Sequence, residues 1–199
     1  DSDLRYPLIV KPANMDNSIG ITNESVVRDE EELRRQIKKV LEISSAALIE
    51  EFIEGDEYDA SGMGNDDELQ VLPLTQSVFK DMPEGYWHIY PFDAKWGEDK
   101  AYSKIIINSP PKNISKKLES LISEIALDTY NILDCHDYGR VEVRVDKDDN
   151  PYVLELNPNP SINEGDETPG SAEMVGMDYG AVLEEIIMLA IKRYKNRPP

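Results

Sequence analysis

Residues 140–157 read RVEVRVDKDDNPYVLELN, and this stretch decides how the rest of the chain is interpreted. Its first half alternates apolar and charged residues with the period of two that is typical of a half-buried strand. The apolar positions are Val141, Val143 and Val145, and the charged positions are Arg140, Glu142 and Arg144. The polar run at 147–150, followed by proline, predicts a turn. The whole stretch is therefore expected to form a β-hairpin.

The register of this hairpin raises a question about two glutamates. If the loop covers 147–150, Asp146 faces Pro151, Glu142 lies opposite Glu155, and Arg140 lies opposite Asn157. Like charges in directly opposite positions repel each other. One interpretation is that this face is solvated and the register is shifted by one residue. The other is that a cation lies between the glutamates and makes the pair a binding site.

Length and charge limit the classes of function. With 199 residues and 40% hydrophobic content, the chain can form one large domain or two small lobes with a real core. The net charge of −19 disfavours nonspecific binding to DNA, RNA or anionic lipid, because such binding depends on Lys and Arg neutralising phosphate. No nucleic-acid or membrane partner is expected, and a phosphate ligand would need local cations or metal ions.

The cysteine content and the hydropathy indicate a cellular location. The single cysteine, Cys135, cannot form an internal disulfide, and no apolar run approaches the roughly 20 residues of a membrane span. No signal peptide is visible, and the sequence starts at Asp1 rather than at a methionine. We expect a cytoplasmic protein with a further N-terminal part that this sequence does not include.

The remaining periodicity predicts an α+β fold. Helical spacing of apolar residues is found at 29–45, 114–133 and 179–194, and strands are expected at 6–12, at 69–79 and as a pair within 46–64 broken at Gly55. Residues 81–100 form a long aromatic and polar segment, and 157–171 form a polar loop. The break divides the chain into a small lobe, 1–53, and a larger lobe, 54–199.

Taken in order, several motifs resemble the ATP-grasp superfamily, and most closely its D-alanine–D-alanine ligase branch. They are IVKP (9–12), DNSIGI (16–21), LIEEFIEGDE (48–57), DAKW (93–96), the hairpin through NPNP (139–160) and GMDYGAVLEEII (176–187). The hairpin with its E-x-N ending is the most specific of them. The resemblance covers nearly the whole chain and implies two α+β lobes with largely antiparallel sheets that sandwich a nucleotide.

This resemblance implies roles for residues that would bind ATP. Lys11 and Lys95 would contact the phosphates, as cations that an acidic protein has to supply locally. Glu50 would accept a hydrogen bond from the adenine amino group, and Glu57 would hold the ribose hydroxyls. The backbone of Glu51, Phe52 and Ile53 would bind the edge of the adenine ring.

The resemblance also implies a metal site and catalytic groups. Glu142, Glu155 and Asn157 would bind Mg²⁺, as two ions that bridge the phosphates, with Mn²⁺ as an alternative. Arg140 would stabilise charge on the transferred phosphoryl group or tetrahedral intermediate, and Lys95 would assist it. Ser18 would cover the phosphates or orient the substrate.

The implied reaction joins a carboxylic acid to an amine. ATP phosphorylates the carboxylate, the amine attacks the resulting acyl phosphate, and phosphate leaves. No covalent protein nucleophile is required, so structural roles are expected for Cys135, His88 and His136. The partners are small-molecule acid and amine substrates and the N-terminal domain of the same protein. The assembly state is left open, with a homodimer as one alternative.

Three departures from the family bear on the substrates. The N-terminal domain that contributes to the substrate site is absent from this sequence, and Trp96 replaces a tyrosine that helps hold the first D-alanine. Asp166 and Glu167 stand where a serine and a leucine grip the second, and two carboxylates would repel its carboxylate. We expect a ligase whose substrates are not two D-alanines. The alternatives are a D-alanine–D-alanine ligase of peptidoglycan synthesis, or a noncatalytic nucleotide-binding or partner-binding module.

Overall fold

The computed structural model describes residues 3–79, 81–97 and 100–195, without the side chains of Lys95 and Trp96. The chain forms two compact units. Unit 1 comprises Asp1–Glu54 and Phe79–Ile105, and unit 2 comprises Gly55–Val78 and Ile106–Pro199. The sequence predicts a single boundary between residues 53 and 54. The observed division differs because the segment 79–105, expected in the larger lobe, groups with unit 1.

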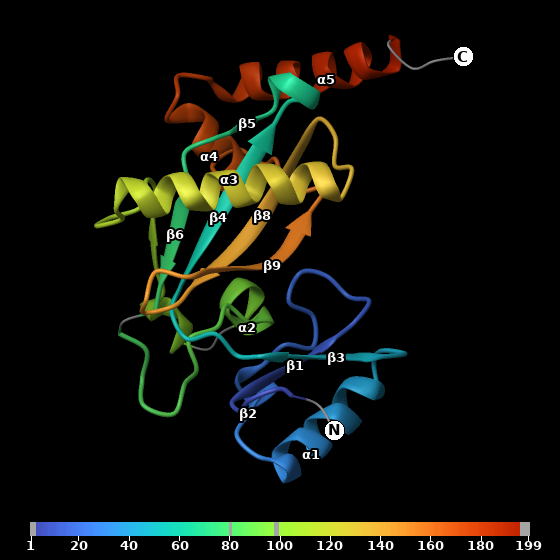
Figure 1. The fold of residues 1–199 in the computed structure, drawn as a ribbon, viewed down its shortest axis with the longest axis vertical. Coiled ribbons are helices and arrows are strands. Elements are labelled where there is room, and N and C mark those ends of the chain that lie inside the picture. The colour runs from blue at the N-terminus through green and yellow to red at the C-terminus, as the bar shows by residue number, and fades with distance from the viewer. Residues whose placement is uncertain (1–2, 80, 98–99, 196–199) are drawn as a thin grey trace. The chain divides into compact units, whose positions relative to one another are not determined.

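Unit 1 is built on a three-stranded antiparallel sheet with the strand order β2-β1-β3 (Figure 1). Its strands are β1 (Leu8–Pro12), β2 (Val26–Val27) and β3 (Ala47–Glu51); its helices are α1 (Glu30–Leu41), α2 (Phe92–Trp96) and the 3₁₀ turns Asn23–Ser25 and Tyr102–Lys104. Helix α1 begins after Asp29, whose side chain accepts a hydrogen bond from the Glu32 N–H at 2.9 Å. Its apolar side packs against Val10 and Val27 of the sheet through Val40.

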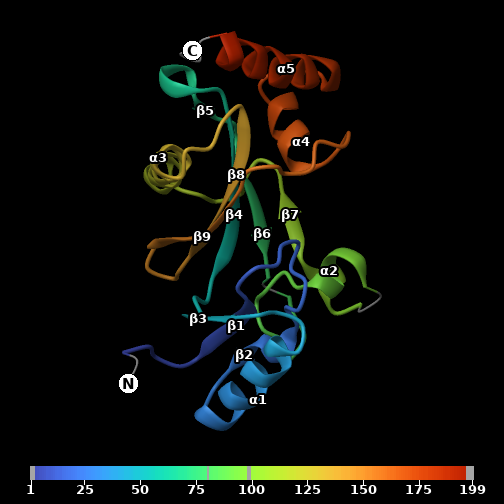
Figure 2. The same ribbon diagram turned by 90° about the vertical axis from the view of Figure 1, so that its right-hand side faces the viewer.

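Unit 2 contains a six-stranded antiparallel sheet in the order β7-β6-β4-β8-β9, with β5 paired to β4. Its strands are β4 (Asp56–Met63), β5 (Gln70–Val71), β6 (Thr75–Val78), β7 (Ile106–Asn108), β8 (Tyr138–Val145) and β9 (Pro151–Asn157). Its helices are α3 (Lys116–Ile132), α4 (Glu167–Glu173), α5 (Tyr179–Lys195) and the 3₁₀ turn Asp66–Glu68. Figure 2 shows α3 and α4 on opposite sides of this sheet.

The α3 side of the sheet carries the main core of unit 2. Buried residues from β4, β8 and α3 pack together here: Tyr58, Ala60, Leu118, Ile122, Ala126, Val141, Val143 and Val145. A second cluster joins α4 and α5 to the end of β4 through Ala172, Val182, Leu189 and Met63. The α+β class with antiparallel sheets is therefore confirmed.

The β8–β9 hairpin has the predicted register in the half that matters for the site. Arg140 lies opposite Asn157, and Glu142 lies opposite Glu155. The register shifts between Glu142 and Val143, because Leu154 is an extra residue on β9 and forms a bulge. The predicted pairing of residue 146 with Pro151 is therefore wrong, and Val145 occupies that position instead.

Two other expectations need correction. The strand predicted at 69–79 is two short strands, β5 and β6, separated by residues 72–74. The polar loop predicted at 157–171 ends in helix α4, which starts at Glu167. In both places the sequence is short and polar or contains proline, so it gives no clear periodicity. The strands and the helix form there because contacts with other parts of unit 2 stabilise them. Among the described residues, none of the helices combines the length and the apolar character needed to cross a membrane.

Candidate functional site

The sheet face of unit 2 opposite α3 carries buried charges. The alternation along β4 and β8 turns Glu57, Asp59, Arg140, Glu142 and Arg144 to this face, while the valines between them face α3. The side chain of Arg140 is only 11% exposed, and that of Asp59 is 10% exposed. Groups of this kind are rarely buried unless they are paired or serve a site.

The guanidinium of Arg140 meets three carboxylates. Its Nη2 donates to Glu142 Oε1 at 2.6 Å, its Nη1 donates to Glu167 Oε2 at 2.6 Å, and its Nε lies 3.2 Å from Asp59 Oδ1. Burial disfavours the charged guanidinium, but these carboxylates outweigh that effect and raise the pKa of Arg140 further above its ordinary value. Arg140 is therefore a fixed cation surrounded by an excess of negative charge.

Asp59 is a further buried acid of the charged face, and it is not among the residues predicted from the sequence. It lies between Thr75 of β6 and Glu142 of β8, and Thr75 Oγ1 donates to Asp59 Oδ2 at 3.3 Å. Burial and the neighbouring carboxylate of Glu142 raise the pKa of Asp59 well above its ordinary value. The alternation of Glu57 and Asp59 with Tyr58 and Ala60 was a sequence signal that could have found it.

The predicted metal ligands come together at the end of the hairpin. Glu142 and Glu155 are direct cross-strand partners, and Asn157 is one alternation further along β9 on the same face. Asn157 Oδ1 accepts the N–H of Asn159 at 3.0 Å. The described residues include no group of three or more His, Cys, Asp and Glu side chains arranged to hold a metal. Two carboxylates and an amide suit Mg²⁺, which takes few protein ligands when phosphates supply the others.

Glu57, predicted to hold the ribose, is tied to Arg144. The two residues are cross-strand partners on β4 and β8, and Arg144 Nη2 donates to Glu57 Oε2 at 2.7 Å. Arg144 Nη1 donates to the Gly55 carbonyl at 2.9 Å. This pair is buried in the charged face: the side chain of Arg144 is 5% exposed, and that of Glu57 is 10% exposed.

In unit 1, two predicted nucleotide ligands form an ion pair. Lys11 of β1 and Glu50 of β3 lie on the sheet face opposite α1, and Lys11 Nζ is 2.7 Å from Glu50 Oε2. Within the described residues, Glu50 Oε2 is buried and accepts no hydrogen bond of good geometry. A buried acceptor of this kind fits a ligand that brings its own donor, such as an amino group.

The segment after β3 has its own contacts. Glu51 accepts hydrogen bonds from the Arg5 side chain and backbone, which lower the pKa of Glu51. The Phe52 N–H donates to the Pro7 carbonyl at 2.9 Å, and the Phe52 ring packs edge-on against Trp87. The Phe52 N–H is therefore already engaged, and the contact of this backbone with an adenine edge stays a prediction.

Ser18 lies in a tight turn of unit 1. Asn17 and Ser18 both adopt positive φ angles, 57° and 58°, and Ser18 Oγ donates to the Tyr90 carbonyl at 3.1 Å. Lys95 and Trp96 belong to α2, but their side chains lie outside the described residues. Their predicted roles therefore stay predictions.

The two carboxylates predicted to select the acceptor have different partners. Asp166 precedes α4 and accepts hydrogen bonds from Ser161 Oγ and, at 3.2 Å, from Asn163 Nδ2. Glu167, in the first turn of α4, pairs with Arg140 instead. Its neighbour Thr168 is fully buried and shares a 2.9 Å hydrogen bond with Ser61 of β4, which fixes α4 on the charged face.

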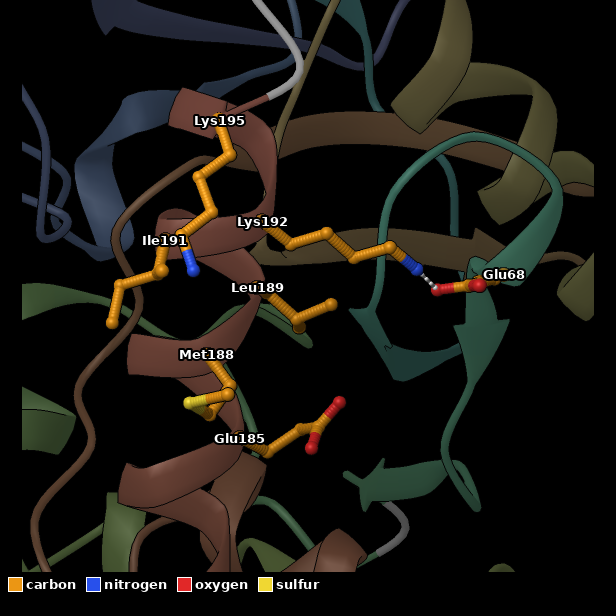
Figure 3. A pocket seen from close by; sticks show the side chains of 7 residues that line it. All are labelled: Glu68, Glu185, Met188, Leu189, Ile191, Lys192 and Lys195. Carbon is orange, nitrogen blue, oxygen red and sulfur yellow. Dashed lines mark hydrogen bonds and ion pairs between the residues drawn. The ribbon is translucent and has the colours of Figure 1, made fainter.

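A separate surface pocket of unit 2 lies along α5. Figure 3 shows Met188, Leu189 and Ile191 lining it, with Lys192 reaching to Glu68. None of the predicted site residues lines this pocket.

The single cysteine, Cys135, is buried, and burial raises the pKa of its thiol, as expected for a structural cysteine.

Comparison with known proteins assigns this arrangement to a family. The model of the family described as D-ala D-ala ligase C-terminus matches residues 1–188. The chain belongs to this family. A D-alanine–D-alanine ligase of Carboxydothermus hydrogenoformans is 34% identical over 190 residues, which are 95% of this chain and 56% of the relative.

Solved structures of related ligases have the same fold. A D-alanine–D-alanine ligase from Bacillus anthracis complexed with ATP superposes with a TM-score of 0.73 and 26% identity, covering 96% of this chain and 54% of that one. The VanG D-Ala:D-Ser ligase from Enterococcus faecalis gives a TM-score of 0.75 and 26% identity, covering 94% and 50%. The family member described here therefore has the ATP-grasp fold. It spans about half the length of the relatives it matches.

Proposed function

We propose that this chain is the ATP-binding and metal-binding part of an ATP- and Mg²⁺-dependent ligase that joins a carboxylic acid to an amine. The observation that carries the proposal is the cross-strand pair Glu142–Glu155 beside the pair Arg140–Asn157. Opposed carboxylates destabilise a hairpin unless a cation neutralises them. Their position next to a buried arginine gives both the metal and the phosphate a place to bind.

Unit 1 would hold the nucleotide base and contribute to phosphate binding. Glu50 supplies a buried acceptor, and Lys11 next to it supplies a cation. In the charged face of unit 2, Glu57 would accept hydrogen bonds from the ribose hydroxyls while Arg144 holds it in place. Lys95 would add a second cation to the phosphates.

Glu142, Glu155 and Asn157 would hold Mg²⁺, with two ions as the arrangement that the family resemblance implies. These residues would place the metal where it would supply charge neutralisation to the phosphate oxygens during phosphoryl transfer to the carboxylate. Arg140 would donate hydrogen bonds to the same developing charge, and Ser18 would orient the substrate. The acyl phosphate then reacts with the amine, phosphate leaves, and the new C–N bond is an amide.

One contact in the structure bears on how Arg140 would take up an anion. Of its three carboxylate partners, Glu167 has the most exposed side chain, 36%, against 14% for Glu142 and 10% for Asp59. An anionic group that binds Arg140 at Nη1 would therefore replace Glu167, which is the partner nearest to solvent. Glu142 and Asp59 would stay in place.

We further propose that the substrates are not two D-alanines. Asp166 is held by Ser161 and Asn163 at the start of α4, close in sequence to Glu167. Carboxylates here would disfavour an acceptor that carries its own carboxylate and would favour an amine-rich acceptor. Trp96 in place of tyrosine supports a different first substrate.

The metal assignment is tested by nucleotide binding to Glu155→Gln with and without Mg²⁺, measured by titration calorimetry on the complete protein. Because the substitution removes one ligand charge, we expect the Mg²⁺-dependent part of the affinity to fall about tenfold. Asp148→Asn is the matched control, since it removes a carboxylate from the exposed turn of the same hairpin. If Mg²⁺ leaves the affinity unchanged, or Glu155→Gln behaves as the control does, the metal site is wrong.

The substrates are tested by a phosphate-release screen of the complete protein over amino acids and polyamines. Phosphate is expected only when a suitable acid and amine are both present, because the acyl phosphate needs both to turn over. Rapid dipeptide formation from D-alanine alone would contradict the specificity proposed from Trp96, Asp166 and Glu167.

A further inference from the structure

Asp59 is a buried carboxylate that lies beside a second carboxylate in the sheet of unit 2. It is flanked by Glu142 on β8, and its side chain is 10% exposed. A carboxylate directly opposite another carboxylate is destabilising, and threonine or valine would suit a central strand better. A costly buried group in this position is therefore better explained by a role in the site than by the fold.

The contacts of Asp59 connect it to Arg140. Its Oδ2 accepts the Thr75 hydroxyl at 3.3 Å, which orients the carboxylate. Its Oδ1 forms an ion pair with Arg140 Nε at 3.2 Å, in which the Nε–H makes no hydrogen bond of good geometry with any described residue. Thr75 is itself only 2% exposed. The anchor of Asp59 is thus rigid and comes from β6, the strand on the side away from Arg140.

The geometry of the guanidinium explains what this contact does. The Nε–H and one Nη2–H point the same way, so a single carboxylate can accept from both in a bidentate pair. In this structure that edge is divided: Nε faces Asp59, and Nη2 donates to Glu142 through Oε1 at 2.6 Å. Asp59 thereby pairs with one of the two nitrogens of this edge, and without it Glu142 could bind both.

We propose that Asp59 is a positioning residue for Arg140: through its ion pair with Nε, it disfavours a bidentate Arg140–Glu142 pair and keeps Glu142 able to bind Mg²⁺. The inference rests on the proposed function, because it assigns Glu142 to the metal. Without Asp59 the guanidinium turns toward Glu142 and competes with the metal for its oxygens. Asp59 acts through Arg140, and it touches neither the metal nor the substrate in this scheme.

The test is the Mg²⁺ concentration that gives half-maximal binding of a nonhydrolysable ATP analogue to the complete protein. Asp59→Asn keeps the shape but removes the charge that pairs with Nε, so this concentration is expected to rise about tenfold, as for other groups that orient metal ligands. The unfolding temperature is expected to stay level or rise, since a repulsion between carboxylates is relieved. A merely structural role would lower it and leave the Mg²⁺ dependence unchanged.

A matched control and a second background separate positioning from simple loss of charge. Asp56→Asn removes a carboxylate from the same strand on the α3 side, where it accepts from Gln76, and is expected to leave the Mg²⁺ dependence unchanged. In an Arg140→Lys background no bidentate pair can form, because lysine is a single point charge. There, adding Asp59→Asn is expected to change the half-maximal Mg²⁺ concentration by less than about twofold.

The outcomes distinguish this inference from the proposed function. If Asp59→Asn raises the Mg²⁺ requirement equally in the wild-type and Arg140→Lys backgrounds, Asp59 acts by charge and the positioning role is wrong. If Asp59→Asn has no effect while Glu155→Gln weakens Mg²⁺-dependent binding, only the inference on Asp59 fails. If Glu155→Gln also has no effect, the proposed metal site and the inference fail together.

Discussion

The two faces of the six-stranded sheet bury side chains of opposite character. On the α3 side, Val141 and Val143 are at most 1% exposed and pack against Ile122. On the other side, Arg140 and Asp59 are buried almost as deeply, at 9% and 8%. The same two strands, with the same period of two, therefore build a hydrophobic core and a charged site back to back.

The two faces differ in the sign of the free energy of burying their side chains. Burial of an apolar side chain stabilises the fold by about 2 kcal/mol or more, whereas a buried charge costs free energy that only partners can offset. The charged face holds the acids Glu57, Asp59 and Glu142 against the cations Arg140 and Arg144. Among the described side chains of this face, these acids outnumber the cations, in keeping with the proposed metal site, whereas the α3 face is apolar.

The largest effect is expected from Arg140→Lys on the charged face. Lysine keeps the charge but cannot hold three carboxylates in the plane of a guanidinium, so transition-state stabilisation is lost. We expect phosphate release to fall about 10³-fold, or about 4 kcal/mol, with little change in unfolding temperature. Arg34→Lys on the exposed side of α1 is the control, and its activity should match wild type. An Arg140→Lys enzyme with near wild-type turnover would remove Arg140 from the mechanism.

The opposite pattern is expected on the α3 face. Ile122 is fully buried, so Ile122→Ala should lower the free energy of unfolding by about 3 kcal/mol, measured by urea titration. Activity per folded molecule should be retained, because the substitution leaves the charged face intact. Ile132→Ala is the control on the same helix, since Ile132 is 80% exposed. Equal losses for the two variants would mean that α3 does not pack as described.

A smaller effect is expected at Asp137, a buried carboxylate whose pKa is lowered, whereas that of Asp59 is raised. Burial opposes its ionisation, but hydrogen bonds from Arg193 and Asn65 outweigh this and lower the pKa of Asp137. Removing the charge should leave these donors without a charged acceptor. Asp137→Asn is therefore expected to lower the free energy of unfolding by about 2 kcal/mol at pH 7, measured by urea unfolding.

The pH dependence of the Asp137 effect has a defined sign. The folded pKa is below the unfolded value of about 3.9, so the stabilisation is complete above that pH and is lost as the pH falls through the folded pKa. The difference between wild type and Asp137→Asn should therefore be constant from pH 7 to about pH 5 and shrink below about pH 4. A difference that persists unchanged at lower pH would point to lost packing rather than lost charge.

Much of the hairpin could be predicted from the sequence, because alternation fixes which side chains share a face. The predicted opposition of Glu142 to Glu155 and of Arg140 to Asn157 is confirmed, although it was placed from a turn that the structure shifts by one residue. The bulge at Leu154 could not be predicted, since a bulge residue has no compositional mark of its own. The bulge adds one residue to β9 and thereby cancels the one-residue error in the turn, so the glutamates have the predicted register.

Other features depend on contacts between segments that are distant in sequence. Helix α4 starts with a residue whose carboxylate reaches Arg140, and its place is set by Thr168 against Ser61. The grouping of 79–105 with unit 1 follows from packing of Ile89 with Ile9 and Val26, which no local pattern announces. The importance of Asp59 became visible only when the register placed it beside Arg140 and Thr75.

The bulge at Leu154 also has a practical consequence for spectroscopy. It separates the glutamate pair from the turn, where Asp146 accepts hydrogen bonds from the N–H groups of Asp148 and Asn150. Cys135, the single cysteine of the chain, is buried with a raised thiol pKa and therefore reacts slowly. A fluorophore could thus be attached selectively to a cysteine introduced at Asp148, as a reporter of hairpin motion that leaves the glutamate pair in register.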